Sequence, residues 1–320
     1  MKTLISRFLP LFGIALLAAA MVFSFASCDN GSDSGSGSDP SDPVKVLGSG
    51  THGDFQYDYT ASTIIITGYT GGGGHVTIPK TIKGKPVTAI RDGAYFKNGS
   101  YFTDGVFYNK QLTSVTIPDS IISIGDWTFF GTFSENSVYR NRLTSVDIPN
   151  SVISIGEGAF AANKLTSITI GNGVTSIGQY AFGYNELTSV IIPDSIIYLN
   201  GFNANPLLTS VTIGNGVTSI GEEAFYQSNL TSVVIPDSVT SIGNGAFFHN
   251  QLSSVIIGNG VTSIGRSAFR SNPLTSITIG ADVMFDDEGP SFDDSFDYAY
   301  NRYNKTAGTY ILGTSWEKIN

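Results

Sequence analysis

Few side chains in this sequence of 320 residues are of the kinds that most often act as nucleophiles, bases or metal ligands: His52, His75, His249 and a single cysteine, Cys28. No regular spacing links the three histidines. The sequence shows no recognisable Ser-His-Asp arrangement and no His-Glu-x-x-His motif, and the glycine run 71–74 lacks the strand and helix that flank a phosphate-binding loop. We therefore expect no catalytic site, no metal and no cofactor, and a protein that is not an enzyme.

The surroundings of Cys28 point to a different kind of chemistry. Two basic residues precede a mostly apolar run at 8–25, and small residues stand directly before the cysteine. These are the parts of a secretory signal, although the run is also nearly long enough for a membrane-spanning helix. The arrangement resembles the lipobox of bacterial lipoproteins, in which the cysteine thiol is acylated. The resemblance implies a signal peptide at 1–27 and a lipid on Cys28.

The residues after the cysteine favour a tether. Residues 29–43 consist largely of Gly, Ser and Asp and contain no large apolar side chain. Such a segment behaves as a flexible acidic spacer, so we expect 28–43 to hold a folded body away from a membrane. The predicted protein is secreted across the inner membrane and lipid-anchored at the cell surface or outer membrane, rather than spanning it. With a net charge of −9 and no basic patch, nucleic acid is not an expected partner.

The rest of the chain is organised by a repeat that begins with Leu-Thr/Ser-Ser-Val/Ile. The first interval between these leucines is 31 residues and the others are 21 or 22. A fixed period of this size is typical of a solenoid, in which each unit buries its apolar face only against its neighbours. The leucines are Leu112, Leu143, Leu165, Leu187, Leu208, Leu230, Leu252 and Leu274.

The unit at 230–251 shows the local pattern. Val233 and Ile235 alternate with polar or outward residues, which predicts a strand. Pro-Asp-Ser follows as a turn. A second short apolar run comes next, for which an extended conformation is one alternative. Ala246 and Phe247 then supply a small and a large core residue.

An asparagine recurs three residues after that phenylalanine. We interpret the asparagines as a ladder in which each amide satisfies backbone groups of adjoining coils, since buried backbone groups need partners. The alternative is a row that binds glycans. The residues are Asn163, Asn185, Asn205, Asn250 and Asn272.

This pattern resembles the leucine-rich repeats of the BspA-like (Treponema-type) class of surface proteins. The resemblance implies a mainly β repeat solenoid with a parallel concave sheet and about nine 22-residue coils, capped at both ends. We place the N-terminal cap at 44–75, the solenoid at 76–280 and an aromatic and acidic C-terminal cap at 281–320. The family resemblance also implies a binding function: adhesion through protein or glycan ligands on a host or other bacteria. The alternative is a structural, self-associating envelope protein without an external ligand.

The outward strand positions carry mostly Ser and Thr. Such ladders stabilise a sheet by cross-strand pairing, or the flat neutral face serves as a platform for a protein or glycan. Three apolar residues stand out on it, and exposed apolar residues often mark contacts: Ile191, Val234 and Ile256.

Two insertions interrupt the repeat, at 97–110 and 132–140. Aromatic residues and arginine are enriched at the centres of interfaces, so these loops are candidate binding elements, with local packing as the equal alternative. The candidates in and beside them are Tyr101, Phe102, Phe107, Tyr108, Phe133, Tyr139, Arg140 and Arg142.

The C-terminal part is rich in carboxylates. A Ca²⁺ site built from their oxygens is one hypothesis, but the spacing fits no known loop, and charge runs are usually solvated surface. The residues are Asp286, Asp287, Glu288, Asp293, Asp294 and Asp297.

Overall fold

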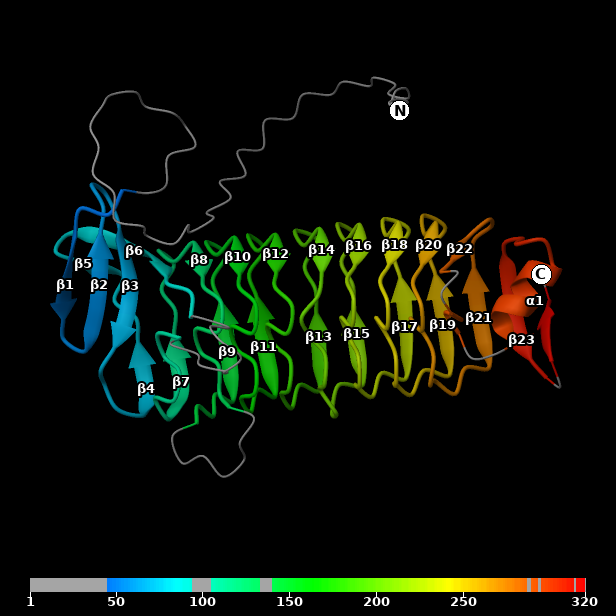
Figure 1. Ribbon diagram of the computed structural model, residues 1–320, viewed down its shortest axis with the longest axis horizontal. Helices are drawn as coiled ribbons and strands as arrows, with labels where there is room; N and C mark the ends of the chain where they lie inside the picture. The colour runs from blue at the N-terminus through cyan, green and yellow to red at the C-terminus, as the bar shows by residue number, and fades with distance from the viewer. Residues whose placement is uncertain are drawn as a thin grey trace, which may run out of the picture. The chain divides into compact units, whose positions relative to one another are not determined.

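The computed structural model describes residues 45–93, 105–132, 140–286, 289–292, 295–313 and 315–319. The chain divides into two units, Met1–Lys45 and Val46–Asn320. In the described part of the second unit, coils of similar shape are stacked one on the next (Figure 1), which confirms the mainly β repeat solenoid. The described residues contain one helix, α1 (Phe296–Arg302). This helix is not long and apolar enough to cross a bilayer.

Each regular coil contributes one longer strand to what we call the long-strand face. Its alternating pattern turns the apolar residues inward, as in β17 (Ser232–Ile235), where Val233 and Ile235 are buried and Val234 is exposed. Neighbouring strands pair in parallel and in register within groups of two or three, so Val233 lies opposite Val255. The strands are β7 (Leu112–Thr116), β9 (Ser145–Ile148), β11 (Ser167–Ile170), β13 (Ser189–Ile191), β15 (Ser210–Thr212), β17 (Ser232–Ile235), β19 (Ser254–Ile257) and β21 (Ser276–Ile279).

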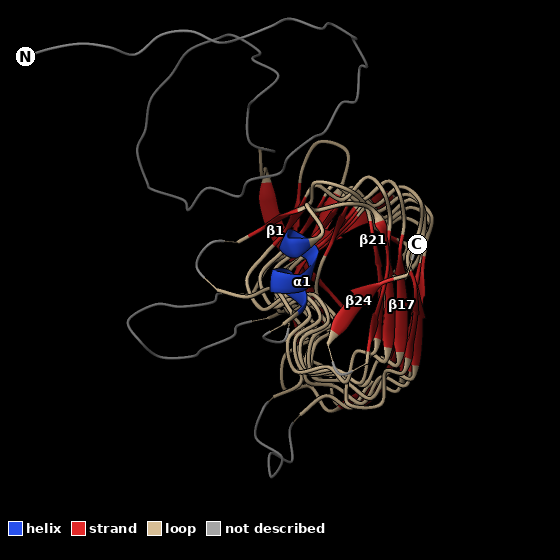
Figure 2. Cartoon of the chain, turned by 90° about the vertical axis from the view of Figure 1, so that its right-hand side faces the viewer, coloured by secondary structure: helices blue, strands red, loops and turns tan. Residues whose placement is uncertain are grey.

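A second ladder of two-residue strands comes from the short apolar run of each coil, which is therefore extended. The family resemblance implied a parallel sheet, and the described coils carry two parallel ladders (Figure 2). Each short strand pairs in parallel with the next. They are β8 (Ser123–Ile124), β10 (Ser154–Ile155), β12 (Ser176–Ile177), β14 (Tyr198–Leu199), β16 (Ser219–Ile220), β18 (Ser241–Ile242), β20 (Ser263–Ile264) and β22 (Met284–Phe285).

The two ends depart from this regular pattern. At the N-terminal end, β1 (Gly48–His52), β2 (Phe55–Tyr59) and β3 (Ile64–Tyr69) are antiparallel, and β3 continues in parallel into β6 (Lys85–Ile90) and the short ladder. Beside them, β5 (Thr81–Ile82) pairs with β6, and β4 (Gly74–Thr77) pairs with β7. At the C-terminal end, β23 (Gly308–Leu312) runs antiparallel to β21, and β24 (Trp316–Lys318) follows it. The cap boundaries given above stay predictions.

The core is a column of phenylalanines, one from each coil. Their ring centroids are 4.7–5.7 Å apart and their planes are within 15° of parallel, because the coils stack at about the strand spacing of roughly 4.8 Å. A buried alanine precedes most of these rings, since a larger residue there would meet the neighbouring coil. The rings are Phe107, Phe129, Phe160, Phe182, Phe202, Phe225, Phe247, Phe269 and Phe292.

The asparagine ladder is present, which confirms its structural interpretation. The Oδ1 of Asn185 accepts the N–H of Leu165 in the preceding coil, at 3.1 Å. Its Nδ2 donates to the carbonyls of Phe160 and Phe182, which belong to the preceding coil and its own coil. Asn163, Asn205, Asn250 and Asn272 make the same set of contacts, as does Asn141, which the repeat pattern had not identified because of the insertion before it.

Candidate interaction surfaces

Each regular coil has a turn in which side chains point outward from left-handed backbone. Glu223 and Gln227 have φ of 55° and 52°, and Ser267 and Ser271 have 56° and 57°. Residues other than glycine rarely adopt this conformation because it crowds the side chain against the backbone. Here it directs each N–H toward the next coil: Glu223 N donates to the carbonyl of Asn244 at 2.9 Å. We call the outer surface of these turns the turn face.

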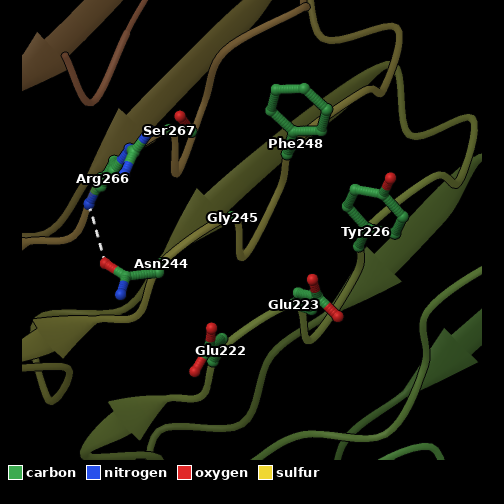
Figure 3. Close-up of a pocket in the computed structure, with 8 residues that line it drawn as sticks. All are labelled: Glu222, Glu223, Tyr226, Asn244, Gly245, Phe248, Arg266 and Ser267. Atoms are coloured by element: carbon green, nitrogen blue, oxygen red, sulfur yellow. Dashed lines mark hydrogen bonds between the residues drawn. The ribbon is translucent and has the colours of Figure 1, made fainter. Parts of the chain in front are cut away.

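The turn face contains a shallow hollow of about 340 Å³ that extends over three coils. Figure 3 shows its lining residues around Gly245. Gly245 has a φ of 58° and occupies the coil position that carries a side chain in Tyr180, Glu223 and Ser267. A Cβ on Gly245 would meet nothing closer than 3.7 Å. The missing side chain therefore creates the hollow, which is lined by Glu222, Glu223, Tyr226, Asn244, Gly245, Phe248, Arg266 and Ser267.

The hollow has an acidic side and a basic side. Glu222 and Arg266 are exposed and occupy the same coil position two coils apart. Between them lies Asn244, whose Oδ1 accepts the backbone N–H of Arg266 at 2.9 Å (Figure 3). The salt bridges among the described residues are Lys80–Asp119, Arg91–Asp58 and Lys164–Glu186, so the charges around the hollow form none.

Aromatic rings complete the wall. Tyr226 and Phe248 are half-buried and stack with their centroids 5.6 Å apart and their planes 7° from parallel. The coil before them is two residues shorter at the turn, so Tyr180 reaches past it and its hydroxyl donates to Glu223 Oε2 at 3.4 Å. Burial and the Glu223 carboxylate raise the pKa of Tyr180 to about 12. Burial, Glu223 and Tyr226 also raise the pKa of Tyr184.

The long-strand face carries the three apolar residues predicted to be exposed. Their side chains are 73% exposed at Ile191, 59% at Val234 and 49% at Ile256. Val234 and Ile256 are direct partners on neighbouring strands, whereas Thr212 is the partner of Ile191. Asp147 is the single charged residue among the predicted outward positions of β7 to β21. The face is therefore flat, nearly neutral and partly apolar.

The insertions give a mixed result. Phe107 was predicted to bind, but this is wrong, because its ring is fully buried and stacks on Phe129 as the first phenylalanine of the core column. Tyr108 is half-buried against Phe130, which favours the packing alternative for that residue. Arg140 is half-buried and Arg142 is exposed. Tyr101, Phe102, Phe133, Tyr139 and the predicted lipidation site Cys28 lie outside the described residues.

The histidines and carboxylates do not gather into a reactive centre in the described parts of the chain. His75 lies on β4, with its ring nitrogens 2.8 Å from Ser114 Oγ and 3.0 Å from Thr77 Oγ1. Asp297 accepts the N–H of Ser291 at 2.8 Å, and burial raises the pKa of its carboxyl group. The described residues contain no group of three His, Cys, Asp or Glu side chains that fits a metal ion. Asp287, Glu288, Asp293 and Asp294 are not described.

The sequence pattern did not single out the hollow. Its signal was nevertheless present: when the coils are aligned, Gly245 stands, like Gly158, at the position where Tyr180, Glu223 and Ser267 carry side chains. Glu222 and Arg266 also occupy one coil position with opposite charge. That alignment does not show whether neighbouring charges pair or whether a missing side chain is replaced by another residue. Both depend on how the coils stack.

Comparison with known proteins agrees with the repeat pattern. The family model of the BspA type leucine rich repeat region matches residues 100–200 and 195–287, with six copies. No curated protein matches the chain.

Several solved structures are similar. A leucine rich cell surface protein of Faecalibacterium prausnitzii is 24% identical with a TM-score of 0.45, covering 75% of this chain and 73% of its own. A leucine rich repeat protein of T. pallidum is 23% identical with a TM-score of 0.37, covering 74% and 83%. The pneumococcal vaccine antigen PcpA is 19% identical with a TM-score of 0.42, covering 75% and 83%.

Proposed function

Because the chain belongs to the BspA type leucine-rich-repeat family, we propose that it is a surface-displayed adhesin that binds proteins of a host or of other bacteria. Repeats of this family generally serve as non-enzymatic binding scaffolds. A stack of nearly identical coils is suited to this task, since it presents long regular surfaces without needing a deep pocket.

The observation that carries the proposal is the long-strand face. A flat surface with little charge and a few exposed apolar side chains resembles the composition of interface centres, where charged residues are depleted. Val234 and Ile256 form one contiguous apolar patch across two strands, because they face each other in register. The patch is small, so we expect binding to depend on it and on the polar surface around it.

The binding test uses purified full chain on a panel of immobilised extracellular-matrix and bacterial surface proteins. We expect saturable binding to at least one of them, and a clear loss of affinity in the double variant Val234→Ser and Ile256→Ser. The matched control is Ile122→Ser with Ile153→Ser, which changes two exposed isoleucines that directly precede β8 and β10 of the other ladder, 40% and 51% exposed. Equal loss in both double variants would move the site away from the long-strand face.

Self-association is the competing outcome. A molecular mass that rises with protein concentration, together with no binding to any member of the panel, would favour a structural envelope protein instead. Analytical ultracentrifugation over a wide concentration range separates the two functions.

Display at the surface is the second part of the proposal, and the sequence around Cys28 supports it. Metabolic labelling with palmitate should mark the wild type and not Cys28→Ala, and protease added to intact cells should remove the labelled protein. Labelled protein that resists the protease would face the periplasm, and the adhesin function would then fail.

A further inference from the structure

We propose that the hollow around Gly245 binds a short dipolar peptide segment of the partner protein, with a basic side chain at Glu222 and Glu223 and a carboxylate at Arg266. This rests on the proposed function and names a second contact, on the turn face rather than on the long-strand face. Three observations carry it: opposite charges that form no salt bridge among the described residues, an open space between them, and a separation of these charges that matches a short extended peptide.

The charges around the hollow are available to a ligand. Glu222 and Arg266 are exposed and belong to none of the salt bridges among the described residues. They do not neutralise each other, because the coil of Asn244 separates them. A ligand with two opposite charges would complement both ends at once, whereas a singly charged ligand would meet one attractive and one repulsive group.

The acidic side also suits a cation. Tyr226 lies beside Glu223 in the lining of the hollow (Figure 3), and aromatic rings attract ammonium and guanidinium groups. Burial is the main cause of the raised pKa of Tyr184, and the Glu223 carboxylate adds to it, in line with negative potential at this end. The hydrocarbon part of a lysine or arginine side chain would pack against the rings.

The spacing sets the length of the segment. Residues at one coil position are separated by about one strand spacing of roughly 4.8 Å, so Glu222 and Arg266 are about 10 Å apart along the stack. An extended peptide advances roughly 3.3 Å per residue, which places the basic residue and the carboxylate about three residues apart. The hollow therefore fits a motif of the type Arg-x-x-Asp.

Gly245 makes the hollow testable without removing a charge. Neighbouring coils place Tyr180, Glu223 and Ser267 at the same position with φ of 58°, 55° and 56°, so the fold accepts side chains there. Gly245→Tyr would fill the space with its ring. The substitution fits, because a Cβ at this position meets only Glu223 Cγ and Phe248 Cβ, at 3.7 and 3.8 Å. Circular dichroism checks that this variant folds.

The experiment is calorimetric titration of the purified full chain with the peptide Ac-Arg-Gly-Gly-Asp-NH₂ at low salt. We expect saturable binding that weakens with added salt. Replacing Arg by Gln, or Asp by Asn, in the peptide should weaken binding about fivefold, the effect of one exposed ion pair. Glu222→Gln should reduce the preference for Arg over Gln, since only the Glu223 carboxylate then remains, and Gly245→Tyr should abolish binding. Asp147→Asn, which removes one carboxylate from the long-strand face, should change nothing.

Two results would overturn the proposal: no saturable heat with the peptide, or binding that is unchanged in folded Gly245→Tyr and in Glu222→Gln. Binding of a neutral trisaccharide such as maltotriose that Gly245→Tyr abolishes would assign the hollow to a glycan instead. The panel assay is run on the same preparations. If the chain binds a panel protein but not the peptide, the peptide-binding role of the hollow is refuted and the proposed function stands. If it binds the peptide but no panel protein, the proposed function is refuted.

Discussion

Asn185 offers the sharpest test of what holds the coils together. Its side chain accepts the N–H of Leu165 and donates to the carbonyls of Phe160, Phe182 and Gly183, all at 3.0–3.1 Å. Asn185→Ala removes these bonds from a residue that is 3% exposed.

The magnitude follows from what each partner retains. Phe160 O still accepts from Asn163, Phe182 O from Asn205, and Gly183 O from the N–H of Ala162. Within the described residues, only the N–H of Leu165 loses its sole partner. One orphaned buried donor costs about 1–3 kcal/mol, and the lost bonds to the carbonyls add about 1 kcal/mol. We expect Asn185→Ala to lower the free energy of unfolding by about 3 kcal/mol.

Ser228 is the natural control, because it occupies the same coil position and is equally buried, 3% exposed. Its hydroxyl has no hydrogen-bond partner among the described residues. The chain tolerates the missing amide because the extra residue before Leu208 lets the Leu208 N–H donate to Asn205 O at 3.0 Å. We expect Ser228→Ala to change the free energy of unfolding by less than about 0.5 kcal/mol.

Urea unfolding followed by far-ultraviolet circular dichroism measures both variants. Neighbouring coils stabilise one another, so a broadened transition for Asn185→Ala is compatible with the argument if its midpoint also falls. Equal midpoints for Asn185→Ala and Ser228→Ala would refute it, since the ladder would then contribute nothing to stability.

Three further predictions concern stability and titration. Phe225→Ala should lower the free energy of unfolding by about 3–5 kcal/mol in the same urea assay, because a fully buried ring leaves a cavity in the column. Tyr180 should ionise at about pH 12 by absorbance at 295 nm, and Glu223→Gln should lower that pKa toward 10.0. Since the folded state holds this proton more tightly, stability should be full below pH 10 and fall as the pH rises through about 12, and Tyr180→Phe should remove that part of the fall. Asp126→Asn should stabilise the protein at pH 7 and less at pH 3, as thermal denaturation will show. Burial and nearby Asp92 raise the pKa of Asp126, and an amide oxygen can still accept the N–H of Glu157.

The repeat allowed the fold to be predicted because the same pattern of residues recurs in every regular coil. Alternation in Val233 and Ile235, the turn after them and the Ala246–Phe247 pair recur with one period, and parallel stacking is the arrangement in which each coil meets an identical neighbour. The asparagine ladder followed for the same reason. Where insertions disguise the period, prediction failed: Phe107 lies five residues before Leu112, as Phe247 lies five before Leu252, but the loop around it suggested a surface residue.

The sequence by itself therefore determined the solenoid, its core column and the exposed residues Ile191, Val234 and Ile256, because each depends on the spacing of residues within one coil. Only the tertiary structure decided the second ladder, the burial of Phe107 and the hollow at Gly245. These depend on contacts between coils: a missing side chain leaves a space only if no neighbour fills it, and two charges remain unpaired only if stacking keeps them apart. Such facts are set by distances across the stack, which the order of residues along one coil does not contain.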